Sequence, residues 1–266
     1  MPIKSFNASQ RMKNVQPPII SIVSDLIKKN PGTISLGQGI VYYGPPQKVI
    51  TNINNLNPSS DYHAYSQVEG MPKLLSIITK KLTNENQINL DEGYDVIVTA
   101  GSNMAFMNII LAIADPSDEI ILLRPYYFNH EMAINMINCK PIIVDTDSNY
   151  QPNLEKIIEA ITPKTKAIVT VSPNNPTGAV CEKEILEKIN ILCKKKGIYH
   201  ISDEAYEYFT YGEANHFLLG HYLILVIIQF HYILYQKLMD LLAGVLVTWL
   251  FQNIYRFQLK KPKILI

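Results

Sequence analysis

The feature that most constrains the fold is an alternation, from residue 96 to residue 201, of short apolar runs with longer stretches of helical spacing. The runs are rich in Ile and Val and too short for buried helices, so they predict strands. The predicted strands lie at residues 96–98, 120–123, 141–144, 167–171 and 198–201. The predicted helices between them lie at residues 103–114, 129–138, 154–161 and 183–196. Apolar strands separated by helices indicate an α/β fold, with a mostly parallel sheet in a three-layer α/β/α arrangement.

Two more helices are predicted before the first strand. Apolar residues recur at helical spacing over residues 19–29, and Asn30-Pro31-Gly32 follows as a helix-ending sequence. A second segment with helical spacing covers residues 72–82. The first of these helices lies in what we expect to be an N-terminal arm.

Charge and cysteine content exclude several classes of protein. The 266 residues include 24 Lys and Arg against 23 Asp and Glu, a net charge of +1, which gives no electrostatic case for nucleic acid or an anionic membrane as partner. The three cysteines show no CxxC spacing, so we expect neither a disulfide framework nor a metal site. The first residues lack the apolar core of a signal peptide, and a cytoplasmic protein is expected.

The composition changes at Phe217. From there to Tyr235 the chain carries no charged residue. By its length, this run could also form a membrane-spanning helix. We therefore divide the chain into an N-terminal arm and helix at residues 1–45, a main domain at residues 46–217 and an apolar tail at residues 218–266. The tail needs an explanation of its own.

Chemically useful residues follow the predicted strands, where α/β folds bind their ligands. Gly101-Ser102-Asn103 leads from a strand into a helix, which suits a phosphate at the helix N-terminus, although Ser102 could simply cap that helix. Tyr127 follows the next strand and could stack on a flat ring or merely pack. The later strands are followed by Ser-Pro-Asn-Asn-Pro-Thr-Gly at residues 172–178 and Ser-Asp-Glu-Ala-Tyr at residues 202–206.

These motifs resemble the class I/II aminotransferases, pyridoxal-phosphate enzymes of fold type I. The two longer motifs are highly specific, and the likeness extends to Ser35–Gly39 and to Tyr65–Gly70. It covers roughly residues 17–217. It implies the large domain of that fold, incomplete at its C-terminus, with pyridoxal 5′-phosphate as the cofactor.

The resemblance also implies roles for individual residues. Asp203 would form an ion pair with the protonated pyridine nitrogen of the cofactor, and Asn175 and Tyr206 would hydrogen-bond the phenolic oxygen. Tyr127 would stack on the ring, while Ser102 and the backbone of Asn103 would hold the phosphate. In a homodimer, Tyr65 would reach the phosphate in the partner subunit, and the Gly39 backbone would approach the substrate carboxylate.

The family also needs a lysine that binds the cofactor, in an S-x-S-K or S-x-x-K motif before a G-W-R-x-G stretch, and this chain lacks both motifs. Lys237 stands at a suitable distance after Asp203, without the serines. However, codons can be chosen for residues 235–252 that read S-K-A-Y-G-F-A-G-W-R-I-G when shifted by one base. This predicts that one base is missing from the coding sequence near Phe217 and that the tail is out of frame.

The predicted function is therefore that of the intact ancestor. It is a pyridoxal-phosphate-dependent aminotransferase (EC 2.6.1.-) that moves an amino group between an amino acid and a 2-oxo acid, and the chain as written is expected to be inactive. Two alternatives stay open. One is a β- or γ-eliminating lyase of the same superfamily, because the same cofactor residues serve both reactions. The other is a non-catalytic fragment, for example a pseudogene product.

Overall fold

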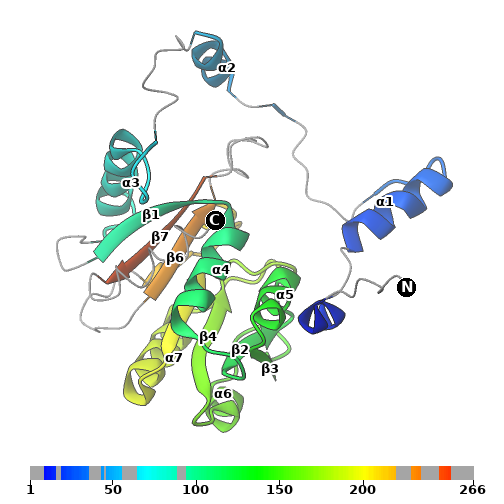
Figure 1. The fold of residues 1–266 in the computed structure, drawn as a ribbon, viewed down its shortest axis with the longest axis vertical. Helices are drawn as coiled ribbons and strands as arrows, with labels where there is room; N and C mark the ends of the chain where they lie inside the picture. The colour runs from blue at the N-terminus through cyan, green and yellow to red at the C-terminus, as the bar shows by residue number, and fades with distance from the viewer. Residues whose placement is uncertain are drawn as a thin grey trace, which may run out of the picture.

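A computed structural model describes residues 9–15, 19–35, 43–44, 46–55, 65–88, 94–219, 229–234 and 246–252. Its centre is a seven-stranded sheet with the order β1-β7-β6-β5-β4-β2-β3 (Figure 1). The strands are β1 (Tyr94–Ala100), β2 (Glu119–Arg124), β3 (Lys140–Asp145), β4 (Thr165–Val171), β5 (Tyr199–Asp203), β6 (Gln229–Leu234) and β7 (Leu246–Gln252). All five strands predicted from the apolar runs are present.

The sheet is mostly parallel, as predicted. Strands β3, β2, β4, β5 and β6 pair in parallel, in that order. Strand β7 runs antiparallel to both of its neighbours, β6 and β1. Because β7 is antiparallel to both β1 and β6, β1 runs in the same direction as the parallel strands. The carboxyl ends of β1, β2, β4 and β5 therefore lie at one edge of the sheet.

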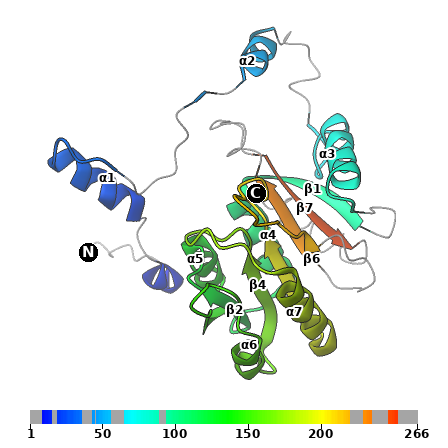
Figure 2. The same cartoon turned by 180° about the vertical axis from the view of Figure 1, so that it is seen from behind.

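Helices flank the sheet and also make up the N-terminal segment. They are α1 (Ile19–Lys29), α2 (Gln47–Asn54), α3 (Pro72–Asn84), α4 (Ser102–Ile113), α5 (Phe128–Met136), α6 (Leu154–Ala160) and α7 (Lys183–Lys196), with a 3₁₀ helix, η1 (Gln10–Asn14). The bounds of α1 and α7 match the prediction, and α7 ends at Gly197, whose φ of 68° is the left-handed conformation common after helices. The elements η1 and α2 were not predicted from the sequence. Helices α1 and α2 lie apart from the sheet in both views (Figures 1 and 2).

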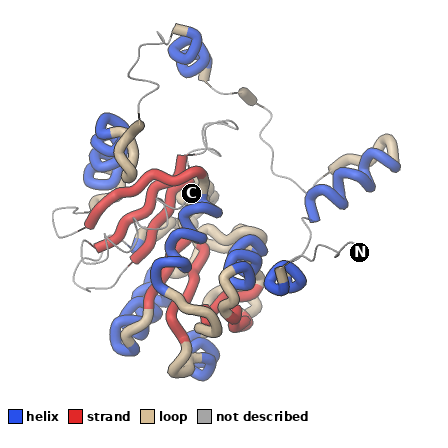
Figure 3. The backbone as a smooth tube through the Cα atoms, in the orientation of Figure 1, coloured by secondary structure: helices blue, strands red, loops and turns tan. Residues whose placement is uncertain are grey.

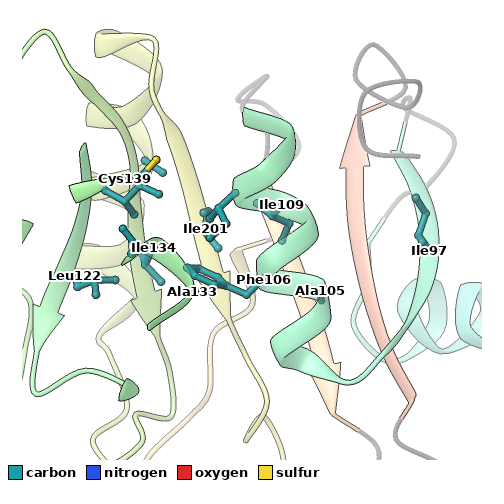
Figure 4. Packing of buried hydrophobic residues seen from close by; sticks show 13 residues of the cluster. Ile97, Ala105, Phe106, Ile109, Leu122, Ala133, Ile134, Cys139 and Ile201 are labelled. Atoms are coloured by element: carbon teal, nitrogen blue, oxygen red, sulfur yellow. The ribbon is translucent and has the colours of Figure 1, made fainter. Parts of the chain in front are cut away.

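Alternate residues of the strands bury opposite faces of the sheet, which confirms the three layers. Ile120 and Leu122 of β2 pack into a core with α4 and α5, whereas Ile121 and Leu123 pack into a second core with α6 and α7. Figure 4 shows the first core, in which Phe106 of α4 lies close to residues of α5 and β5. A third cluster packs α3 against β1.

The predicted tail at residues 218–266 contains two strands that the sequence analysis did not assign. Strand β6 pairs with β5, and β7 pairs with β1, so together they fill the sheet between β5 and β1 (Figure 3). Both segments are rich in aromatic and β-branched residues, which favour strands, and their pairing covers two otherwise open sheet edges. The division of the chain at residues 45 and 217 stays a prediction.

The alternative of a membrane-spanning helix was based on the uncharged run after Phe217. Among the residues that the structure describes, none of the helices is long and apolar enough to cross a bilayer. Residues 220–228 of that run lie outside the described residues.

Candidate active site

The predicted site residues lie at the carboxyl edge of the sheet. Val171 at the end of β4 is paired with Asp203 at the end of β5, so the two long motifs begin side by side. The turn before α4 and the loop after β2 supply the other predicted residues. The structure thus brings together Ser102, Asn103, Tyr127, Asn175, Asp203 and Tyr206 from four strand ends.

Asp203 is a buried carboxylate with a fixed orientation. Its side chain is 6% exposed, and its Oδ1 accepts a hydrogen bond from the Ala205 amide at 3.0 Å. Nε2 of His130, on α5, lies 3.3 Å from Oδ2 of Asp203. The His130 ring is also buried, with its centroid 4.2 Å from that of Phe106. These contacts hold an acceptor group in an almost dry environment, where its interaction with a positive partner is strong.

Asn175 and Tyr206 meet between the two loops that follow β4 and β5. The Asn175 amide donates to the Tyr206 hydroxyl over 3.4 Å, which joins the loop after β4 to the turn after β5. The preceding residue, Asn174, braces the loop: its Oδ1 accepts from the amide and the hydroxyl of Thr177, at 3.1 and 2.9 Å. Its Nδ2 donates to the carbonyl of Pro125 at 3.3 Å. The dense polar motif after β4 therefore fixes two strand-end loops against each other.

The turn before α4 has the form of an anion site. Gly101 has a φ of 87°, which a residue with a Cβ rarely adopts, and it is the N-cap of the helix. Ser102 and Asn103 are the first helical residues, so the alternative that Ser102 caps the helix is wrong. Amides of the first helical turn have no partner within the helix and point along the positive end of its dipole. A phosphate is the ligand that such a turn favours.

Tyr127 immediately precedes α5 and contacts the same region. Its ring lies edge-on to His130, with centroids 5.3 Å apart. Burial raises the pKa of the Tyr127 hydroxyl, a hydrogen bond from Asn129 lowers it, and the charge of Asp203 raises it again. The hydroxyl therefore stays protonated near neutral pH, as a neutral group beside a carboxylate.

Sequence reasoning missed His130 and Asn129. Both are polar residues of α5, in a stretch where the sequence showed only helical spacing, and nothing in the local pattern sets them apart from a solvated helix face. The available signal was their position, directly after Tyr127 at the end of a strand. For these two residues, a position close to Tyr127 in the sequence indicated a place in the site better than residue type did.

Three predicted site residues are not part of the described cluster. Tyr65 is fully exposed ahead of α3, and its role toward a partner subunit stays a prediction. Gly39 and Lys237 lie outside the described residues.

A buried ion pair anchors the turn that carries Tyr206. Nζ of Lys81, on α3, lies 2.7 Å from Oε1 of Glu207, and Asn86 donates to Oε2 of Glu207 at 3.1 Å. Burial raises the pKa of Glu207, and the charge of Lys81 opposes that rise. The Tyr208 hydroxyl also donates to Glu85, at the end of α3. These contacts tie α3 to the residues that follow Asp203.

We expect Lys81→Met to destabilise the domain strongly, because it leaves the Glu207 carboxylate buried without its cation. Removing one partner of a buried pair costs about 3–5 kcal/mol. Thermal or urea denaturation measures the change. The matched control is Lys28→Met, since the Lys28–Asp25 pair has side chains 78% and 67% exposed and its loss should leave unfolding unchanged. Equal unfolding curves for the two variants would contradict the anchoring role.

Comparison with protein families agrees with this geometry. Residues 31–229, three quarters of the chain, match the family described as aminotransferase class I and II. The chain belongs to this family. The resemblance found in the three motifs and the three-layer fold are thereby confirmed, and the family is in general pyridoxal-phosphate-dependent.

Individual aminotransferases show how much of the family this chain covers. It is 33% identical over 213 residues to an aromatic aminotransferase of Arabidopsis thaliana, covering 78% of this chain and 53% of the relative. An aspartate/prephenate aminotransferase of Thermus thermophilus is 38% identical over 158 residues, 59% of this chain and 40% of that protein. The chain therefore spans about half the length of the curated relatives it matches.

The likeness in structure extends further along this chain than the likeness in sequence. A solved alanine aminotransferase of Pyrococcus furiosus superposes with a TM-score of 0.85 at 27% identity, over 97% of this chain and 68% of its own. The family match ends at residue 229, where β6 begins. Strands β6 and β7 thus lie within the range that resembles the solved fold but almost entirely beyond the range that matches the family's sequences.

Proposed function

We propose that this domain binds pyridoxal 5′-phosphate at the carboxyl edge of the sheet, as part of an enzyme that moves an amino group between an amino acid and a 2-oxo acid. The observation that carries the proposal is the placement of Asp203. It is buried and held by Ala205 and His130, at a sheet edge where Asn175 and Tyr206 join the loops after β4 and β5. When bound, the cofactor supplies an electron sink, which is deepest with its pyridine nitrogen protonated.

The residues present fit the ring of this cofactor. A buried carboxylate such as Asp203 stabilises a proton on a ring nitrogen, because the charged pair forms where water is largely excluded. Asn175 and Tyr206 offer an amide N–H and a hydroxyl O–H to one phenolic oxygen from two neighbouring strand ends. Tyr127 supplies an aromatic face next to His130. The ring would thus be held at its nitrogen, at its oxygen and on one face.

The phosphate of the cofactor would lie at the N-terminus of α4. Gly101 makes the turn into the helix with a positive φ, and the amides of Ser102 and Asn103 open the helix. A dianion at this position gains from both the amide hydrogens and the helix dipole. Affinity should therefore depend on the phosphate as well as on the ring.

The names of the relatives support amino transfer, rather than elimination, as the reaction of the whole protein. They are aminotransferases described for aromatic amino acids or for aspartate and prephenate. A homodimer in which Tyr65 reaches the partner's phosphate and the Gly39 backbone approaches the substrate carboxylate belongs to the same proposal. The covalent lysine would come from the restored reading frame, where S-K overlaps the codons of residues 235–237, between β6 and β7.

Titration of the purified chain with pyridoxal 5′-phosphate tests the binding site directly. We expect saturable binding without a covalent bond, because the ring and phosphate contacts lie within residues 101–206. Pyridoxal, which lacks the phosphate, should bind at least about tenfold more weakly, the effect of losing roughly 1.4 kcal/mol of charge-assisted hydrogen bonding. Equal affinity for the two compounds, or no saturable binding of either, would contradict the proposed site.

A further inference from the structure

Asn129 connects two parts of the proposed cofactor site that come from different helices. Its Nδ2 donates to the Tyr127 hydroxyl at 2.6 Å and to Oδ1 of Asn103 at 3.2 Å. Tyr127 precedes α5, while Asn103 is in the first turn of α4. One side-chain amide therefore spans the space between the aromatic ring and the phosphate turn.

An asparagine amide is suited to this bridge. Its NH₂ group carries two hydrogens in one plane, so it can donate to two acceptors at once. The bond to Tyr127 is short, at 2.6 Å, and the bond to Asn103 is of ordinary length, at 3.2 Å. Helices α4 and α5 also share one apolar core, which fixes their relative position. The bridge adds a polar link at their active-site ends.

The direction of these bonds also determines what the Tyr127 hydroxyl can do. Because Asn129 donates to the phenolic oxygen, one lone pair of that oxygen is used and its own proton stays available for an acceptor. The bond from Asn129 also lowers the pKa of Tyr127, against the rise caused by burial. Loss of the bridge should therefore loosen the Tyr127 ring, which keeps its own contact with Asn103, and raise the pKa of the Tyr127 hydroxyl.

We propose that Asn129 is a positioning residue of the cofactor site, which holds the Tyr127 ring and the Asn103 turn in one arrangement for a ring-and-phosphate ligand. The inference rests on the proposed function. It assigns a role to a residue that touches neither the ring nor the phosphate in that proposal. Its consequence is a coupling between recognition of the ring and recognition of the phosphate.

The test compares Asn129→Ala with Asn135→Ala, an equivalent change at the other end of α5. We measure the affinity of the purified full chain for pyridoxal 5′-phosphate and for pyridoxal, and the pKa of Tyr127 in ligand-free protein by NMR of labelled tyrosine. In Asn129→Ala we expect about tenfold weaker binding of the phosphate form, roughly the net cost of losing one hydrogen bond that orders the site, with a smaller loss for pyridoxal. The pKa of Tyr127 should rise. Asn135→Ala should change neither.

A second background separates positioning from a general loss of structure. In Tyr127→Phe, which removes the hydroxyl, Asn129→Ala should weaken binding by a smaller factor than in the wild type, because the two residues act through one contact. Equal factors in both backgrounds, or an Asn129→Ala affinity equal to that of Asn135→Ala, would overturn the inference while leaving the cofactor site intact. Failure of the wild-type chain to bind the cofactor would instead overturn the proposed function, and this inference with it.

Discussion

Adding one base before the codon of Phe217 is expected to turn an inactive chain into an active aminotransferase. As written, the chain should show no detectable transamination, whereas the frame-restored protein should reach the range of ordinary enzymes, at least about 10⁶-fold above the uncatalysed reaction. The measurement is 2-oxo-acid-dependent amino transfer with a panel of acidic and aromatic amino acids. Borohydride should fix the cofactor to the lysine of the restored S-K pair and to no other residue.

The expectation follows from what a catalytic amine requires. The amine must lie within bonding reach of the reacting carbon and be activated by its surroundings. A suitable sequence separation from Asp203 is therefore not sufficient. Lys237 lies at a suitable number of residues after Asp203, but the serines and the arginine stretch of the family motif are missing around it. Strands β6 and β7 lie on either side of this segment, almost wholly outside the matched sequence.

A base added after the codon of Gln252 is the matched control, because it leaves residues 217–252 as they are. That protein should stay inactive. The gene sequence provides a second, independent check, since the restored motif requires particular codons over residues 235–252. Codons that cannot give the motif, or turnover by the unrepaired chain with the cofactor fixed to Lys237, would show that the reading-frame explanation is wrong.

The sheet and its helices could be predicted because buried strands appear in the sequence as short apolar runs, and helices as apolar residues at helical spacing. The five apolar runs of β1 to β5 and the helical spacing of α1, α3 and α4 to α7 need no long-range information. The loops after β4 and β5 were predictable for a different reason. Their polar residues exceed what a turn requires, and they recur at successive strand ends.

The elements that could not be predicted depend on contacts between distant segments. Strands β6 and β7 come from a tail that is mostly apolar up to residue 251, so its apolar runs do not locate a strand; their place is set by the open edges of β5 and β1. His130 and Asn129 gain their significance only when α5 lies against Asp203 and α4. Helical spacing predicts that a helix exists, and packing determines which polar side chains face a site.

Replacing Asp203 by alanine in the frame-restored protein should reduce turnover by about 10³-fold, the scale of losing one preorganised charge at a reacting group. The carboxylate is the only acid that the proposal places against the ring nitrogen, and His130 and the Ala205 amide keep it in position. Without it, the cofactor's nitrogen loses the partner that favours its protonated form, and the electron sink is shallower.

The same variant should still bind the cofactor, because the α4 turn, the Asn175–Tyr206 pair and the restored lysine are unchanged. Bound cofactor is therefore measured alongside kcat and KM, which separates lost chemistry from lost binding. Asp145→Ala is the matched control: Asp145 ends β3, the edge strand three positions from β5, forms an exposed ion pair with Arg124 and should leave turnover near the restored level. If Asp203→Ala and Asp145→Ala turn over equally with full cofactor content, the ring nitrogen does not depend on Asp203, and the orientation proposed for the cofactor at this edge of the sheet is wrong.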